Sequence, residues 1–322
     1  MMNEITEALG LGQLLSGPQR ITGGLLHRMD RIHCESGFYA LKTLNPQIMK
    51  RPEAMVHMVH SERIARELKC TVPVVHAIEI GGDVVFSLNG KHYMLYPWME
   101  GESVFPPNIT AGHCAVMGDM LGRMHKADVQ VDGVKKNTPE EVRMNWALLP
   151  KDNAELAMLF DHRAMIAKWQ SEANESVKAL SFHQVISHRD LDLKNVLWQG
   201  EMPLIIDWEA AGYINPWQEM METAFYWADD GKGSLDESLF KAFATAYGQH
   251  VSLTNVCWKT VFAACFQGML GWLYYNVRRG CGPENADDED KKTGMQQVQQ
   301  TLIALKAMDK KIRLAEQWLK EM

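Results

Sequence analysis

The segment SHRDLDLKNVLW, at residues 187–198, constrains this chain more than any other stretch. It crowds six polar or charged side chains between two apolar runs, QVI before it and VLW at its end. Polar groups are costly to bury without partners, so a cluster of this kind is either a solvated turn or a functional site. The spacing of the chemically active residues decides between these two interpretations.

The segment fits the spacing H-R-D-x-x-x-x-N, in which Asp190 and Asn195 occupy the last two fixed positions. A further aspartate, Asp207, ends the apolar run LIID twelve residues after Asn195. A carboxylate and an amide oxygen are hard ligands suited to Mg²⁺, and another carboxylate can orient a hydroxyl and accept its proton. The pattern is typical of a phosphoryl-transfer site, with Asn195 and Asp207 as metal ligands and Asp190 as the catalytic residue.

Two charges in the first part of the chain complete this pattern. Lys42 lies in an expected strand, FYALKTL, whose two faces are both largely apolar, and Glu62 interrupts the apolar stripe of the helix that follows. Each charge would be costly to bury alone. We therefore predict that Lys42 and Glu62 form an ion pair that holds the ammonium against nucleotide phosphates, with Glu53 and Glu67 on the same helix as alternative partners.

The order of the expected elements indicates an α+β fold with two lobes. Residues 1–97 alternate like an antiparallel sheet that carries one main helix, and residues 98–322 are mostly helical. We expect the first lobe to bind nucleotide and the second to carry the catalytic loop, the metal loop and the acceptor cleft. Strands are expected in VPVVHAIEI, DVVFSL, HYMLYPW, QVIS, NVLW and PLIID, and late helices at about 217–229, 235–249, 252–278 and 294–321.

These motifs resemble the aminoglycoside phosphotransferase and choline kinase branch of the protein-kinase-like superfamily, over nearly the whole chain. ITGGLLHRM is similar to its nucleotide loop, FYALKTL to its lysine strand, YPWMEGES to its hinge, HRDLDLKNVLW to its catalytic loop and LIIDWEAAGYINP to its metal loop. The resemblance implies a bilobal protein-kinase-like fold that uses ATP and Mg²⁺. The cofactor-binding residues that it implies are Gly23, Gly24, Lys42, Glu62, Tyr96 and Trp98.

The resemblance favours a small hydroxylated acceptor over a protein substrate. Only nine positions separate Asp207 from Pro216, and no DFG or APE follows, which leaves little room for a peptide-docking segment. Two departures from the branch are Arg189, where a small or variable residue is usual, and Glu219, where an aspartate is frequent. Two alternatives stay open: a protein or spore-coat-type kinase, and a catalytically silent pseudokinase that binds nucleotide or a partner.

The acidic residues after the metal loop bear on the acceptor. If several of them face the cleft, they favour a cationic substrate such as an aminoglycoside, another basic antibiotic or an amino alcohol, and antibiotic resistance becomes a possible role. A solvated acidic surface is the opposite interpretation. The residues concerned are Glu209, Glu219, Glu222, Asp229, Asp230, Asp236 and Glu237.

Several polar residues have structural explanations of their own. We expect His125 and His188 to be satisfied by hydrogen bonds in the interior, and His57 and His60 to lie on a solvated helix face rather than on a metal. Asp192 either approaches the acceptor or caps the turn.

Composition excludes some classes of partner. A formal charge of −7 and a pI near 6.0 argue against a nucleic-acid or membrane-surface binder. The most apolar segment, residues 260–275, is shorter than the roughly 20 residues of a membrane span, and we expect a buried helix there. The opening residues do not resemble a secretory signal and the six cysteines are scattered, so a cytoplasmic protein with reduced thiols is expected.

Overall fold

The chain folds into two compact units that each draw on separate stretches of sequence. The computed structural model describes residues 2–21, 26–136, 138, 140–149, 156–281 and 288–322. Unit 1 comprises residues 1–105, 127–135 and 186–212, and unit 2 comprises residues 106–126, 136–185 and 213–322. An antiparallel sheet dominates unit 1 and helices dominate unit 2, which confirms the α+β class. The predicted lobe boundary after residue 97 stays a prediction.

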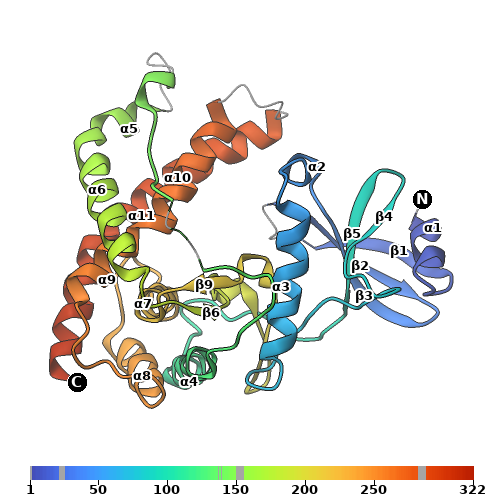
Figure 1. Cartoon of the computed structure of the whole chain (residues 1–322), viewed down its shortest axis with the longest axis horizontal. Helices are drawn as coiled ribbons and strands as arrows, with labels where there is room; N and C mark the ends of the chain where they lie inside the picture. Colours follow the sequence, from blue (N-terminus) through green and yellow to red (C-terminus); the bar gives the residue numbers. More distant parts are fainter. Residues whose placement is uncertain (1, 22–25, 137, 139, 150–155, 282–287) are drawn as a thin grey trace. The chain divides into compact units, whose positions relative to one another are not determined.

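Unit 1 is built on a five-stranded antiparallel sheet with the strand order β1-β2-β3-β5-β4 (Figure 1). Pairing in β3 sets Leu41 opposite Leu95 and Lys42 opposite Met94, so these two neighbours in sequence point to opposite faces of the sheet. Lys42 thus lies on a sheet face as predicted. The strands are β1 (Leu14–Ile21), β2 (Arg28–Cys34), β3 (Gly37–Thr43), β4 (Phe86–Leu88) and β5 (Lys91–Pro97).

A different helix covers each face of this sheet. Helix α1 (Met2–Ala8) packs with Ile5 against the face that carries Leu41 and Leu95. Helix α3 (Ala54–Leu68) follows the four-residue helix α2 (Pro46–Met49) and lies beside the sheet (Figure 1). Its Met58 packs with Met94 on the other face of the sheet. Lys42 is therefore enclosed between α3 and the sheet, and 5% of its surface is exposed.

The strand predicted in VPVVHAIEI is wrong. The backbone of this segment divides its hydrogen bonds among several partners instead of following one neighbouring strand. Val75 N–H donates to Ile205, Ile78 N–H donates to Leu95, and Ala77 N–H donates to the Glu62 carboxylate. A regular ladder needs successive bonds to one partner, so only isolated bridges form here.

A hairpin of two short strands follows the predicted catalytic segment in unit 1. In β7 (Val196–Gln199) and β8 (Met202–Ile205), Val196 lies opposite Ile205, as the apolar runs NVLW and PLIID predict. The 3-10 turn η3 (Leu193–Asn195) precedes the hairpin and η4 (Trp208–Ala210) follows it. Two further short strands, β6 (Val185–Ser187) and β9 (Gly212–Ile214), lie where the chain passes between the units.

Unit 2 is helical throughout its described part, apart from loops and the ends of β6 and β9. Gly118 brings α4 (Ala111–Ala127) and α8 (Glu237–Gly248) together, because a Cβ there would overlap the carbonyl oxygen of Phe243. Gly294 has the same function between α11 (Asp288–Glu321) and α10 (Phe266–Cys281), since its Cβ would lie 2.8 Å from the Gly280 nitrogen. Its elements are α4 (Ala111–Ala127), η1 (Trp146–Leu148), α5 (Ala157–Asp161), α6 (Arg163–Leu180), α7 (Pro216–Trp227), α8 (Glu237–Gly248), α9 (Trp258–Ala264), α10 (Phe266–Cys281) and α11 (Asp288–Glu321).

The late helices differ from the predicted ones in their bounds. The helix expected over 252–278 is two helices, α9 and α10, and it begins later because Asn255 has a left-handed φ of 61°. Helix α11 begins six residues earlier than expected, at Asp288. Its first turn holds three carboxylates, which suit the positive end of a helix dipole. Among the described residues, no helix has the length and apolar character needed to cross a membrane.

Candidate active site

The predicted catalytic segment is anchored by His188. Its Nδ1 accepts a hydrogen bond from the Asp190 N–H at 3.3 Å, so its Nε2 carries the proton and donates to the Ile206 carbonyl at 3.0 Å. The ring is fully buried and packs edge-on against Trp208. His188 thus ties the catalytic loop to the strand that precedes Asp207, which confirms its predicted structural function.

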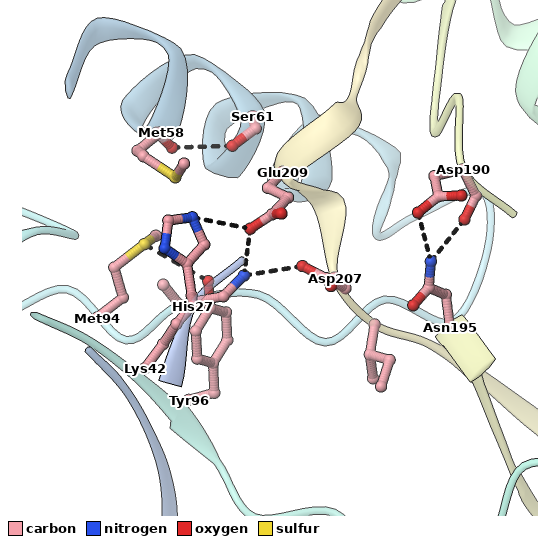
Figure 2. Close-up of polar contacts among 12 residues, drawn as sticks. His27, Lys42, Met58, Ser61, Met94, Tyr96, Asp190, Asn195, Asp207 and Glu209 are labelled. Carbon is pink, nitrogen blue, oxygen red and sulfur yellow. Dashed lines mark hydrogen bonds and ion pairs between the residues drawn. The ribbon is translucent and has the colours of Figure 1, made fainter. Parts of the chain in front are cut away.

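Asp190 and Asn195 contact each other directly (Figure 2). The Asn195 amide nitrogen donates to the Asp190 carbonyl at 2.7 Å and to its carboxylate at 3.0 Å. This leaves the amide oxygen of Asn195 available as a metal ligand. Burial raises the pKa of Asp190, and the Lys194 ammonium, 3.9 Å away, opposes this change. A carboxylate with a raised pKa is a stronger base toward a hydroxyl.

The hairpin brings Asp207 next to this pair. Asn195 precedes β7 and Asp207 follows β8, and the Ile206 N–H donates to the Asn195 carbonyl at 2.9 Å. Asp207 adopts a left-handed conformation, with φ 58° and ψ 64°. A residue with a side chain rarely adopts this geometry, which costs about 1–3 kcal/mol and is enriched at functional sites. The hairpin therefore explains why two residues twelve positions apart can serve one site.

Lys42 links this site to the sheet. Its ammonium donates to Asp207 at 2.8 Å and to Glu209 at 2.6 Å. Burial disfavours the charged lysine, but these two carboxylates outweigh it and raise the lysine pKa above its ordinary value. The same contact holds the pKa of Asp207 below its usual range despite burial. The charged form of Lys42 is thus favoured, and its ammonium sits against the predicted metal ligand.

The predicted ion pair between Lys42 and Glu62 is wrong. Glu62 is buried, and its two oxygens accept hydrogen bonds from the Tyr96 hydroxyl at 2.8 Å and from the Ala77 N–H at 2.6 Å. Burial raises the pKa of Glu62, and these two donors partly offset that effect. Because neutral donors already satisfy Glu62, the ammonium pairs with carboxylates of the metal loop. Lys42 acts on Glu62 only through space.

Of the other residues predicted to contact nucleotide, the structure describes Tyr96 and Trp98. Tyr96 lies beside Ala40 on the face that carries Lys42. Trp98 continues from β5, and the Arg31 guanidinium stacks on its ring at 4.5 Å. Gly23 and Gly24 lie outside the described residues.

The sequence did not assign roles to Arg189 and Asp192, and the structure shows what each side chain contacts. Arg189 has a left-handed φ of 67°, and its guanidinium lies 3.1 Å from where a Gly212 Cβ would be. It therefore packs across the end of the metal loop, where a Cβ at position 212 would crowd the guanidinium. Asp192 makes no side-chain cap on η3, and its carboxylate lies 3.6 Å from Lys194 Nζ.

Three contacts around Lys42 and Glu209 were not predicted from sequence. Glu209 accepts from Lys42, His27 lies 3.5 Å from the Glu209 carboxylate, and His57 donates to its backbone carbonyl at 2.8 Å. His57 is exposed on α3, as expected, and its bond to Glu209 is additional to that expectation. The only sequence signal for Glu209 is its position two residues after Asp207.

The acidic residues after the metal loop are engaged within unit 2. Glu219 is buried against His125, which also bonds Tyr247 and is the satisfied core histidine that was predicted. Asp229 pairs with Lys311, and Glu237 pairs with Lys241. Asp230 and Asp236 accept from nearby backbone N–H groups, and Glu222 accepts from Gln218. These contacts, with Glu209 held by Lys42, remove much of the support for a cationic acceptor.

The donor set fits magnesium better than a transition metal. Among the described residues, no group of three or more His, Cys, Asp or Glu side chains is arranged to hold a metal ion. Mg²⁺ in phosphoryl-transfer sites needs one or two protein oxygens, because substrate phosphates and water complete its shell. Asp207 and the Asn195 amide oxygen meet that requirement, and Lys42 adds a cation suited to phosphate.

A profile of the Phosphotransferase enzyme family matches residues 19–251, which is well over half of the chain. The chain belongs to this family. It is also 28% identical to homoserine kinase from Pseudomonas aeruginosa (strain UCBPP-PA14) over 188 residues, which cover 57% of this chain and 57% of that protein. The match therefore spans little more than half the length of that relative.

Solved structures share the fold at lower identity. Spectinomycin phosphotransferase in complex with ADP and spectinomycin superposes with a TM-score of 0.65 at 14% identity, covering 95% of this chain and 97% of that one. Amicoumacin kinase with AMP-PNP and Ca²⁺ gives a TM-score of 0.64 at 13% identity, covering 92% of each chain. These likenesses confirm the kinase-like fold that the motifs predicted.

Proposed function

We propose that this protein transfers the γ-phosphoryl group of ATP, with Mg²⁺, to a hydroxyl of a small molecule. The observation that carries the proposal is the cluster formed around the β7–β8 hairpin. It joins Asp190, Asn195 and Asp207 in one site, with the Lys42 ammonium 2.8 Å from Asp207. Membership of the phosphotransferase family supports the same reaction.

Each residue of the cluster has a distinct task in this reaction. Asn195 and Asp207 would hold Mg²⁺, and the buried ammonium of Lys42 would neutralise phosphate charge. Asp190 orients the acceptor hydroxyl and takes its proton as the new oxygen–phosphorus bond forms. The bond between the γ-phosphorus and its bridging oxygen breaks, and the electron pair leaves with ADP. The products are a phosphate ester, ADP and one proton, which Asp190 releases.

Homoserine is the first acceptor to test, because the curated relatives that match this chain are homoserine kinases. Homoserine carries both an ammonium and a carboxylate, so it does not depend on an acidic cleft. Aminoglycosides, other basic antibiotics and amino alcohols follow, in line with the antibiotic kinases that share the fold. The structure offers them less electrostatic support, since the carboxylates expected to attract them have partners of their own.

The proposal is tested by supplying the purified protein with ATP, Mg²⁺ and a panel of acceptors. The panel contains homoserine, choline, ethanolamine, spectinomycin, aminoglycosides, macrolides, neutral sugars and a generic protein substrate. ADP release is measured first, and the product is checked for the added mass of one phosphoryl group. We expect a small-molecule product that Asp190→Asn does not form. A phosphorylated protein with every small molecule inert, or intact nucleotide binding without any product, would contradict the proposal.

A further inference from the structure

Glu209 is held at three points by residues from separate elements of unit 1. Lys42 on β3 donates to its carboxylate at 2.6 Å, and His27, which directly precedes β2, lies 3.5 Å from the same oxygen (Figure 2). His57 on α3 bonds its backbone carbonyl at 2.8 Å. The turn that follows Asp207 is therefore fastened to the sheet and to the main helix at once.

The hydrogen bonds of His27 and His57 show which ring nitrogen of each carries the proton that points at Glu209. The Asn45 N–H donates to His27 Nδ1 at 2.9 Å, so the Nε2 that faces the Glu209 carboxylate carries the hydrogen. A carbonyl oxygen can only accept, so His57 Nε2 donates to it. His27 is buried, and burial lowers its pKa, which favours this neutral form. Both rings are thus oriented as donors toward the same residue.

Glu62, unlike Glu209, makes no hydrogen bond to Lys42. Its two oxygens are occupied by Tyr96 and Ala77, which fasten α3 to β5 and to the segment before β4. Glu62 therefore stabilises the position of the helix, whereas Glu209 makes the direct contact with the ammonium.

We propose that Glu209, rather than Glu62, is the positioning residue that orients Lys42, and that His27 and His57 hold Glu209 in place for this purpose. The inference rests on the proposed function, because Lys42 is oriented for the phosphates of ATP. It assigns a function toward Lys42 to Glu209 in the metal-loop motif, to His27 in the nucleotide-loop motif and to His57 on α3, none of which was among the predicted catalytic, metal-binding or cofactor-binding residues.

Kinetics of two isosteric variants test the assignment of Glu209. Glu209→Gln keeps the size of the side chain and removes its charge, and we expect kcat/KM for ATP to fall about 10- to 100-fold, as for a misplaced catalytic group. Glu62→Gln should have a smaller effect. The Mg²⁺ concentration that gives half-maximal rate should stay near the wild-type value in Glu209→Gln. A raised Mg²⁺ requirement with unchanged affinity for nucleotide would overturn the proposal and assign Glu209 to the metal.

Two substitutions at His27 separate positioning from simple packing. His27→Gln can retain an N–H near the place of Nε2, facing Glu209, whereas His27→Asn can retain an acceptor for the Asn45 N–H and loses the group that faces Glu209. Positioning predicts that the Gln variant keeps most of the activity and that the Asn variant loses it. The reverse order would overturn the assignment. His92→Gln, which changes a histidine bonded to Ser87 in the β4–β5 hairpin, is the matched control.

The contact between Lys42 and Glu209 can also be tested without any acceptor molecule. The shifts in denaturation midpoint caused by Lys42→Met and Glu209→Gln should be non-additive in the double variant, because each removes the partner of the other. The shifts caused by Lys42→Met and Glu62→Gln should be closer to additive. Additive shifts for Lys42 and Glu209 would overturn the inference even if the protein is an active kinase. Non-additive shifts in a protein that phosphorylates nothing would refute the proposed function and leave the contact established.

Discussion

Replacing Lys42 by methionine removes the cation of the site while keeping an unbranched side chain of similar length. The ammonium lies 2.8 Å from Asp207 and 2.6 Å from Glu209. Loss of a cation aimed at transferring phosphate typically lowers the rate about 100-fold or more, which corresponds to about 2.7 kcal/mol of transition-state stabilisation. We expect this loss mainly in kcat, because the phosphates gain charge as the reaction proceeds.

The same substitution should also destabilise the folded protein. Removing one member of a fully buried ion pair costs about 3–5 kcal/mol, because the other charge is left uncompensated. The Asp207 side chain is 38% exposed and that of Glu209 21%, so water compensates part of the loss. A decrease of about 1–3 kcal/mol in the free energy of unfolding is therefore expected.

The assay compares steady-state rates and denaturant unfolding of the wild type, Lys42→Met and Lys50→Met. Lys50 is an exposed lysine bonded to Gln47 and serves as the control. Near-normal turnover in Lys42→Met would refute the reasoning and require another cation at the phosphates. Arg28, the first residue of β2, is one alternative, but its guanidinium is already held by Asp30 at 2.6 and 2.9 Å.

Two further predictions concern acidity and packing. Burial raises the pKa of Asp190 and the Lys194 ammonium lowers it, so the acid limb of the kcat/KM profile should lie at a higher pH than an ordinary aspartate would give. Lys194→Met should move this acid limb to a still higher pH. An unchanged pH profile would argue against Asp190 as the base. Gly118→Ala should lower the free energy of unfolding by about 1–3 kcal/mol because its Cβ would overlap the Phe243 backbone, whereas Gly112→Ala on the same helix meets only Thr110 at 3.5 Å; equal stability of the two variants in denaturant would contradict the packing argument.

The parts of the site that could be predicted from sequence are those fixed by local geometry. Asn195 and Asp207 flank a hairpin, so their approach follows from two short apolar runs and a turn. Lys42 on a sheet face follows from alternation along one strand. The buried positions of α3 follow in the same way from its apolar stripe, since Met58, Glu62 and Leu68 are all buried.

The parts that could not be predicted depend on contacts between distant segments. Which carboxylate reaches Lys42 depends on the left-handed conformation of Asp207, which directs the turn that carries Glu209. Glu62 was a reasonable partner by its position, but a tyrosine hydroxyl and a backbone N–H from later segments already satisfied it. The segment at 72–80 has the alternation of a strand, yet its N–H groups are divided among separate partners. None of these choices is encoded in a local pattern.

The most direct test of the central claim is the affinity for a magnesium complex of a non-hydrolysable ATP analogue, measured by calorimetry in three proteins. Asp207→Ala should lose magnesium-dependent binding, because it removes the carboxylate ligand. Asp190→Asn should bind like the wild type while its phosphoryl transfer is lost, because Asp190 acts on the hydroxyl and not on the metal. Wild-type affinity for the magnesium complex in Asp207→Ala, or full transfer by Asp190→Asn, would contradict the account of the site.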